Sequence, residues 1–185
     1  MRNAYLTSHF PLISIILFSL SFAIYSEQII IIYLKNIGLY GGMIEFFSER
    51  GIQLTLLFLL WLFFFMLFSA LKLIADTINE LSLLFFSKDQ EGTDLKNVRG
   101  GAWIFLIGSL CSIAATVHIY FLLGIFAACC LLYFIFFVYK IGESLTSLSL
   151  IGMIFFHVFF WFSFGLAIIY ALLKLYNSLI ASLPV

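Results

Sequence analysis

Charge is scarce in this chain. Nine of its 185 residues are Lys or Arg and nine are Asp or Glu, so charged residues make up 10% and apolar residues 64%. Soluble domains have about 25% charged and about 45–50% apolar residues, so this chain has too little polar surface to cover a water-soluble core. The composition excludes a soluble enzyme, a disordered regulator and a secreted disulfide scaffold. Because the two signs balance, no basic field exists that would attract nucleic acid.

Residues that form chemical motifs are also sparse. Cys111, Cys129 and Cys130 lie inside apolar runs, and the sequence holds no CxxC pair and no His–Cys cluster with metal-binding spacing. A glycine-rich phosphate loop, a hydrolase elbow and an HExxH motif are also lacking. We therefore predict no metal site, no disulfide framework, no cofactor and no enzymatic activity.

Long apolar runs are what the chain does contain. A hydrocarbon core of about 30 Å needs roughly 20 apolar residues in a helix, and unbroken runs exclude the alternating strands of a β-barrel. The sequence predicts an all-α, polytopic membrane protein, a single domain over residues 1–185 with about five transmembrane helices in one bundle. Four or six spans are the alternatives. The predicted spans cover approximately residues 10–34, 52–74, 101–117, 121–140 and 150–175.

The first span has a competing interpretation. The sequence SFA at 21–23 fits the small-x-small cleavage pattern of a signal peptide. However, only Arg2 lies before the apolar run, and a second apolar stretch begins at Ile29. We therefore expect the span to be retained, with Glu27 at the membrane interface.

The second span continues as a helix beyond its apolar run. An apolar stripe recurs every three or four residues from Leu71 to Phe85. Lys72, Asp76 and Glu80 recur every fourth residue on another face. A helix from Ile52 to Phe86 would be about 52 Å long, so we expect it to extend beyond the bilayer.

Two interpretations of this polar stripe compete. In the first, Lys72, Asp76, Asn79 and Glu80 are solvated near the end of the span. In the second, they line a cavity that binds an ion or a proton, because a charge at the bilayer centre costs about 2.5–3.5 kcal/mol and usually has a function. His157, inside the fifth span, is either a neutral imidazole bonded to a neighbouring helix or a member of a proton relay.

Other patterns concern packing and loops. Small residues four apart allow close helix approach, and the polar segment 87–101 is a linker or a partner-contact loop. The small-residue sets are Gly108 and Ser112, Gly124 and Ala128, and Ser163, Ala167 and Ala171.

Positive charges favour a cytoplasmic N-terminus. With five spans, five basic residues fall on the N-terminal side of the membrane and three on the other side, and cytoplasmic loops carry the excess of Lys and Arg. The first group is Arg2, Lys88, Lys96, Arg99 and Lys140, and the second is Lys35, Arg50 and Lys174.

Three passages carry a family resemblance. They are HFPLISIILFSLSFAIYSE at 9–27, LKLIADTINELSLLFFSKD at 71–89 and KLYNSLIASLP at 174–184. Together they resemble the YufK-like family of small, uncharacterised multi-pass membrane proteins of Bacillus-type bacteria. The resemblance implies a bacterial cell membrane location and transfers no residue role.

The functional prediction is a non-enzymatic accessory or interaction protein of the bacterial cytoplasmic membrane. Its expected partners are the lipid bilayer and other membrane proteins or a second copy, and no nucleic acid. The alternative is a small transporter or channel component that uses Lys72, Asp76, Asn79, Glu80 and His157. A membrane-embedded enzyme is the third alternative, without a visible nucleophile or metal constellation.

Overall fold

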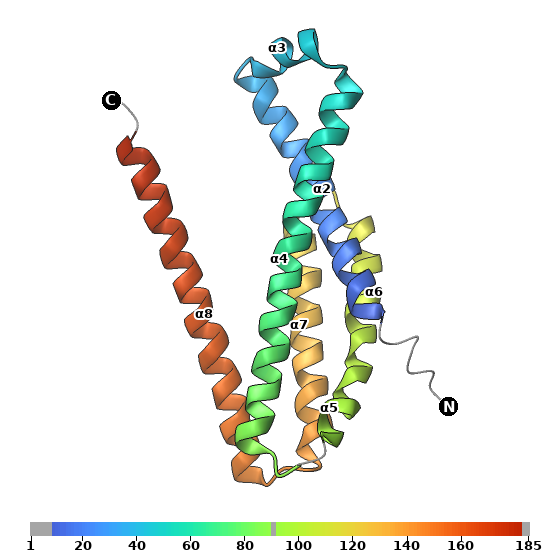
Figure 1. The fold of residues 1–185 in the computed structure, drawn as a ribbon, viewed down its shortest axis with the longest axis vertical. Helices are drawn as coiled ribbons and strands as arrows, with labels where there is room; N and C mark the ends of the chain where they lie inside the picture. Colours follow the sequence, from blue (N-terminus) through green and yellow to red (C-terminus); the bar gives the residue numbers. More distant parts are fainter. Residues whose placement is uncertain (1–8, 90–91, 183–185) are drawn as a thin grey trace.

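A computed structural model describes residues 9–89 and 92–182, and within these ranges the secondary structure is helical with no strand. Arg2, used above for sidedness, lies outside the described residues. The elements are α2 (Phe10–Asn36), α3 (Leu39–Phe46), α4 (Glu49–Phe86), α5 (Thr93–Val98), the 3-10 turn η1 (Arg99–Gly101), α6 (Ala102–Ala114), α7 (Ile119–Gly142) and α8 (Ser147–Ser182), as Figure 1 shows.

Among the described residues, five segments are long and apolar enough to cross a membrane: α2, α4, the stretch Thr93–Ala114 that includes α6, α7, and α8. The prediction of an all-α protein with about five spans is therefore confirmed. Four of the five predicted ranges fall inside α2, α4, α7 and α8. The third range runs too far, because residues 115–117 form the turn between α6 and α7.

Helix α4 is continuous through the charged stripe. It has 38 residues, which corresponds to about 57 Å and exceeds the roughly 30 Å of a hydrocarbon core. Its start is fixed by Ser48, whose hydroxyl oxygen accepts a hydrogen bond from the Gly51 amide at 3.1 Å. Its end is fixed by Ser87, which turns into extended backbone. One rigid element therefore carries Lys72, Asp76 and Asn79 along the bundle.

The central core joins α2, α4, α6 and α7. Its buried members are mostly aromatic, and ring pairs between α2, α4 and α7 lie at centroid distances of 5.1 to 6.0 Å. Such pairs add about 0.5–1.5 kcal/mol each beyond their buried area. The buried cluster consists of Phe18, Phe22, Phe68, Leu122 and Cys129.

Small residues bring α6 close to α2 and α7. The Ser112 hydroxyl lies 2.8 Å from the Ser21 hydroxyl of α2, and a Cβ added at Gly108 would collide with Cys129 of α7. The predicted close-approach pattern at 108 and 112 is thus at a helix contact. By contrast, Gly124 and Ala128 are exposed on α7.

Asp94 joins two loops at the end of the bundle where α4 ends and α8 begins. This side chain is 5% exposed and accepts hydrogen bonds from the hydroxyls of Ser87 at 2.8 Å and Ser144 at 3.0 Å. Its own amide donates to Asp89 at 2.8 Å. The polar segment after α4 is therefore folded against the turn between α7 and α8.

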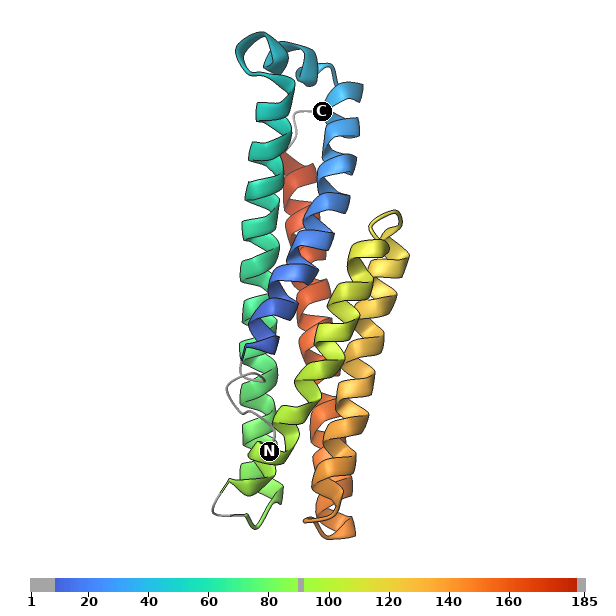
Figure 2. The ribbon, with the colours of Figure 1, turned by 90° about the vertical axis from the view of Figure 1, so that its right-hand side faces the viewer.

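Helix α8 leaves the bundle along its length. Its first turns pack on α4 and α7, where Met153 joins a buried cluster with Leu83 and Phe137. From Leu166 to Ala181 every residue is exposed. Figure 1 shows this half diverging from α4, and in Figures 1 and 2 the C-terminal end lies toward the α2–α3–α4 turn.

Candidate functional site

A polar cluster, which we call the α4–α7–α8 junction, consists of the buried His157 and the half-buried Asn79 and Tyr133. His157 of α8 is 2% exposed, and its Nε2 lies 3.2 Å from Oδ1 of Asn79 on α4. The other end of the Asn79 amide group lies 3.5 Å from the Tyr133 hydroxyl oxygen of α7. The second ring nitrogen of His157, Nδ1, lies 3.0 Å from the Met153 carbonyl oxygen one turn earlier. Three helices thus meet at one polar contact.

Aromatic rings surround the imidazole. A desolvated charge without a counter-ion is strongly unfavourable in such surroundings, so they favour neutral His157. The ring centroids lie 5.3 Å away for Phe137, 5.4 Å for Phe134 and 5.9 Å for Phe156.

Neutrality fixes the hydrogen-bond directions. The Met153 carbonyl can only accept, so Nδ1 carries the proton and Nε2 must accept. Nε2 faces the Asn79 oxygen, which also accepts, and this arrangement would suit only a doubly protonated ring. A half-turn of the Asn79 amide resolves the conflict. Asn79 then donates to Nε2 and its oxygen accepts the Tyr133 hydroxyl proton, so every group in the junction is satisfied.

The charged residues of the stripe lie beside this junction rather than in it. Lys72 and Asp76 form an ion pair one turn apart, with side chains 37% and 46% exposed. Glu80 is exposed. Of the five predicted residues, the structure joins Asn79 to His157, pairs Lys72 with Asp76 and leaves Glu80 apart.

Two residues of these polar clusters were not predicted from the sequence. Tyr133 lies in an unbroken apolar run, where nothing marks it as the third member of the junction. Asp94 lies in a mixed-charge segment whose composition indicates a solvated loop, yet it is buried. Only the spatial arrangement of the helices shows the role of either side chain.

The described residues also bear on metal and ligand binding. In the stretches 9–89 and 92–182, no three His, Cys, Asp or Glu side chains gather where they could hold a metal ion. A pocket of about 250 Å³ lies elsewhere, between α2 and α4, and is lined by Glu27, Arg50 and Gln53 together with two leucines. At the junction, the polar side chains contact one another and the rings of Phe134 and Phe137 pack against His157.

We expect the junction to stabilise the packing of α8 through coupled side chains. Asn79→Ala and His157→Phe should each lower the free energy of unfolding by about 1–3 kcal/mol, since each leaves a buried or half-buried polar partner unsatisfied. The double variant should lose less than the sum, with a coupling energy of about 0.6–1.7 kcal/mol, as for hydrogen bonds between membrane helices. Unfolding in mixed micelles, followed by circular dichroism, measures the free energy of unfolding of the wild type, the two single variants and the double variant.

Thr77→Ala is the matched control for this cycle. Thr77 is exposed on α4, and its hydroxyl bonds only to its own helix at the Leu73 carbonyl. It should therefore show no coupling to His157→Phe. Strict additivity of Asn79→Ala and His157→Phe would contradict the hydrogen-bonded junction.

Comparisons with known proteins place this architecture in a family. The model of the DUF5366 family, a family of unknown function, matches residues 27–184. The chain is also 46% identical to the uncharacterized membrane protein YufK of Bacillus subtilis (strain 168), over the full length of both chains. These findings confirm the resemblance found in the sequence. No solved structure matches the chain. With five apolar helices and a full-length membrane-protein relative, the chain is a membrane protein that belongs to the DUF5366 family.

Proposed function

We propose that the protein is a non-enzymatic accessory or interaction protein of the bacterial cytoplasmic membrane. The observation that carries the proposal is the outer half of α8. Every residue from Leu166 to Ala181 is exposed, and this half extends away from the bundle as regular helix (Figure 1). A helix that its own bundle does not cover offers surface to another membrane protein or to a second copy.

The chemistry of this surface supports helix association. Lipid tails provide no hydrophobic drive between helices, so association relies on small residues that allow close backbone approach. Ser163, Ala167 and Ala171 are all exposed on α8. In the same protein, Gly108 and Ser112 serve that role between α6 and its neighbours.

The arrangement of the polar residues also favours a structural role. The His157 nitrogens each have a partner within the protein, and Lys72 is paired with Asp76. The His157–Asn79 contact joins α8 to α4, whereas the Lys72–Asp76 pair lies within α4. A transport pathway would instead need polar groups that face a cavity.

Two arms of one experiment test the accessory role. In native membranes, a photo-cross-linking residue at Ala171 on α8 should give a discrete protein adduct, whereas the same residue at exposed Leu131 on α7 should not. In liposomes, the purified protein should conduct protons or cations no faster than protein-free vesicles, as reported by a trapped pH dye and by tracer ions.

Either arm can contradict the proposal. Flux that Asp76→Asn abolishes and Thr77→Ala preserves would establish the transporter alternative. Adducts with lipid alone at both cross-linking positions would remove the basis for an interaction role of α8.

The distribution of charge supports a cytoplasmic N-terminus. The end of the bundle near Asp94 carries Lys88, Lys96, Arg99 and Lys140, whereas the opposite end carries Lys35, Arg50 and Lys174. The excess of Lys and Arg marks the cytoplasmic side. With an odd number of spans, the C-terminal end of α8 then lies outside.

Thiol labelling in intact cells tests this orientation. In a variant without native cysteines, Glu45→Cys on α3 should react with an impermeant maleimide, because α3 lies at the external end. Lys88→Cys should react only after the cells are permeabilised. The reverse pattern would show that the N-terminus is external.

A further inference from the structure

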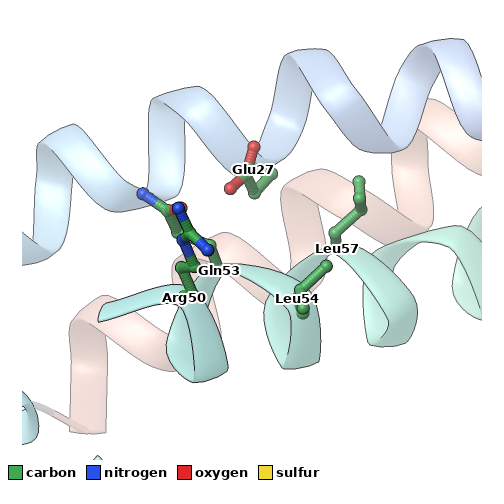
Figure 3. Close-up of a pocket in the computed structure, with 5 residues that line it drawn as sticks. All are labelled: Glu27, Arg50, Gln53, Leu54 and Leu57. Atoms are coloured by element: carbon green, nitrogen blue, oxygen red, sulfur yellow. The ribbon is translucent and has the colours of Figure 1, made fainter. Parts of the chain in front are cut away.

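The pocket between α2 and α4 presents opposite charges on facing helices. Glu27 comes from α2, and Arg50 and Gln53 come from the first turns of α4, as Figure 3 shows. Leu54 and Leu57 complete the lining. Glu27 and Gln53 are half-buried and Arg50 is exposed, so the pocket is open at one side.

Glu27 and Arg50 form no direct ion pair. Among the described residues the one ion pair is Lys72–Asp76, far along α4, so none joins Glu27 to Arg50. Neighbouring charges have other contacts: Glu49 accepts a hydrogen bond from Tyr40 at 3.4 Å, and the Lys35 ammonium lies 4.8 Å from the centre of the Tyr40 ring. A carboxylate and a guanidinium therefore face the same space, each with free hydrogen-bonding capacity.

The lining specifies a ligand that carries both signs of charge. A guanidinium binds phosphate oxygens through two parallel hydrogen bonds. The Gln53 amide, which also bonds to Tyr40, lines the same pocket and has a second N–H to donate. A carboxylate binds an ammonium group that can donate N–H bonds. The volume of about 250 Å³ is below the roughly 300–1,000 Å³ of pockets that enclose drug-sized ligands. A small zwitterionic phosphate ester fits these properties.

The leucines favour a lipid as the source of that zwitterion. Leu54 is 67% exposed next to Arg50, so an aliphatic surface continues from the phosphate-binding group along α4. On α4 the pocket lies at the first turns, where Arg50 precedes the long apolar run of the helix. We propose that this pocket binds the headgroup of an aminophospholipid, with the phosphate on Arg50 and Gln53, the ammonium on Glu27 and an acyl chain along Leu54 and Leu57.

Lipid retention by the full chain tests the proposal. The purified protein is mixed in detergent with phosphatidylethanolamine, phosphatidylcholine or phosphatidylglycerol of identical acyl chains, and bound lipid is counted by native mass spectrometry. Phosphatidylethanolamine should be retained about tenfold more strongly, a difference equal to one good charge-assisted hydrogen bond. The choline headgroup lacks N–H donors for Glu27, and the glycerol headgroup lacks the positive charge.

Substitutions test which residues bind the ammonium group and which bind the phosphate. Glu27→Gln should remove the preference for ethanolamine over choline while keeping binding of the phosphate. Arg50→Gln should weaken retention of phosphatidylethanolamine and of phosphatidylcholine. Gln53→Leu, which changes no charge, should weaken retention of the same two lipids to a smaller extent. Lys174→Gln, at an exposed position on α8, is the control and should leave retention unchanged. Melting temperatures equal to that of the wild type show that a variant is folded.

The alternatives give different results. Equal retention of the three lipids, or a preference that survives Glu27→Gln and Arg50→Gln in folded variants, would overturn the proposal. Displacement of the lipid by free phosphoethanolamine at equal concentration would overturn the lipid source in favour of a soluble zwitterion. These outcomes are independent of the accessory role, which depends on α8 and on the absence of flux.

Discussion

The hydrogen bond between His157 and Asn79 is the constraint on which the placement of α8 depends. In the described part of the chain, it is the one side-chain hydrogen bond that joins α8 to another helix. The same Asn79 also bonds to Tyr133 of α7, so one amide fixes the positions of three helices. Beyond this contact, α8 diverges from α4, and its described residues from Leu166 to Ala181 are all exposed. The buried residues of α8, Met153 and His157, lie in its first turns, and the stretch from Leu166 to Ala181 is open to lipid or to another protein.

The two ends of the molecule differ in how their polar residues are used. At the end closed by Asp94, hydroxyl groups from two loops satisfy a buried carboxylate, which ties the α4–α5 segment to the turn before α8. At the other end, Glu27 and Arg50 face a pocket without an ion pair between them. The polar groups at the Asp94 end therefore hold two loops together. Those at the other end line a pocket. The long α4, with 38 residues, connects the two ends as one rigid helix.

Much of the fold was predictable because apolar run length is a local property of the sequence. The five long helices of the described residues follow from it. The continuity of α4 through its charged stripe follows from the helical period of its apolar residues, and the close approach at Gly108 follows from the spacing of small residues. The contacts of the junction were not predictable, because His157 and Asn79 are 78 residues apart and their pairing depends on the relative register of two helices. Tyr133 gave no signal for the same reason. The mixed charges around Asp94 are typical of a solvated loop, yet the side chain is buried. Its burial results from the folding of this segment against the turn between α7 and α8, which local composition does not reveal.

Distance measurement by electron paramagnetic resonance tests the role of the junction most directly. In a variant without native cysteines, spin labels at exposed Thr77 on α4 and exposed Val158 on α8 report the separation of the two helices beside the junction. We predict a narrow distance distribution that broadens toward longer distances when Asn79 is replaced by Leu, because the only side-chain hydrogen bond to α8 in the described residues is lost. An unchanged narrow distribution in the Asn79→Leu variant would show that apolar packing alone holds α8, and would contradict the central role of this hydrogen bond.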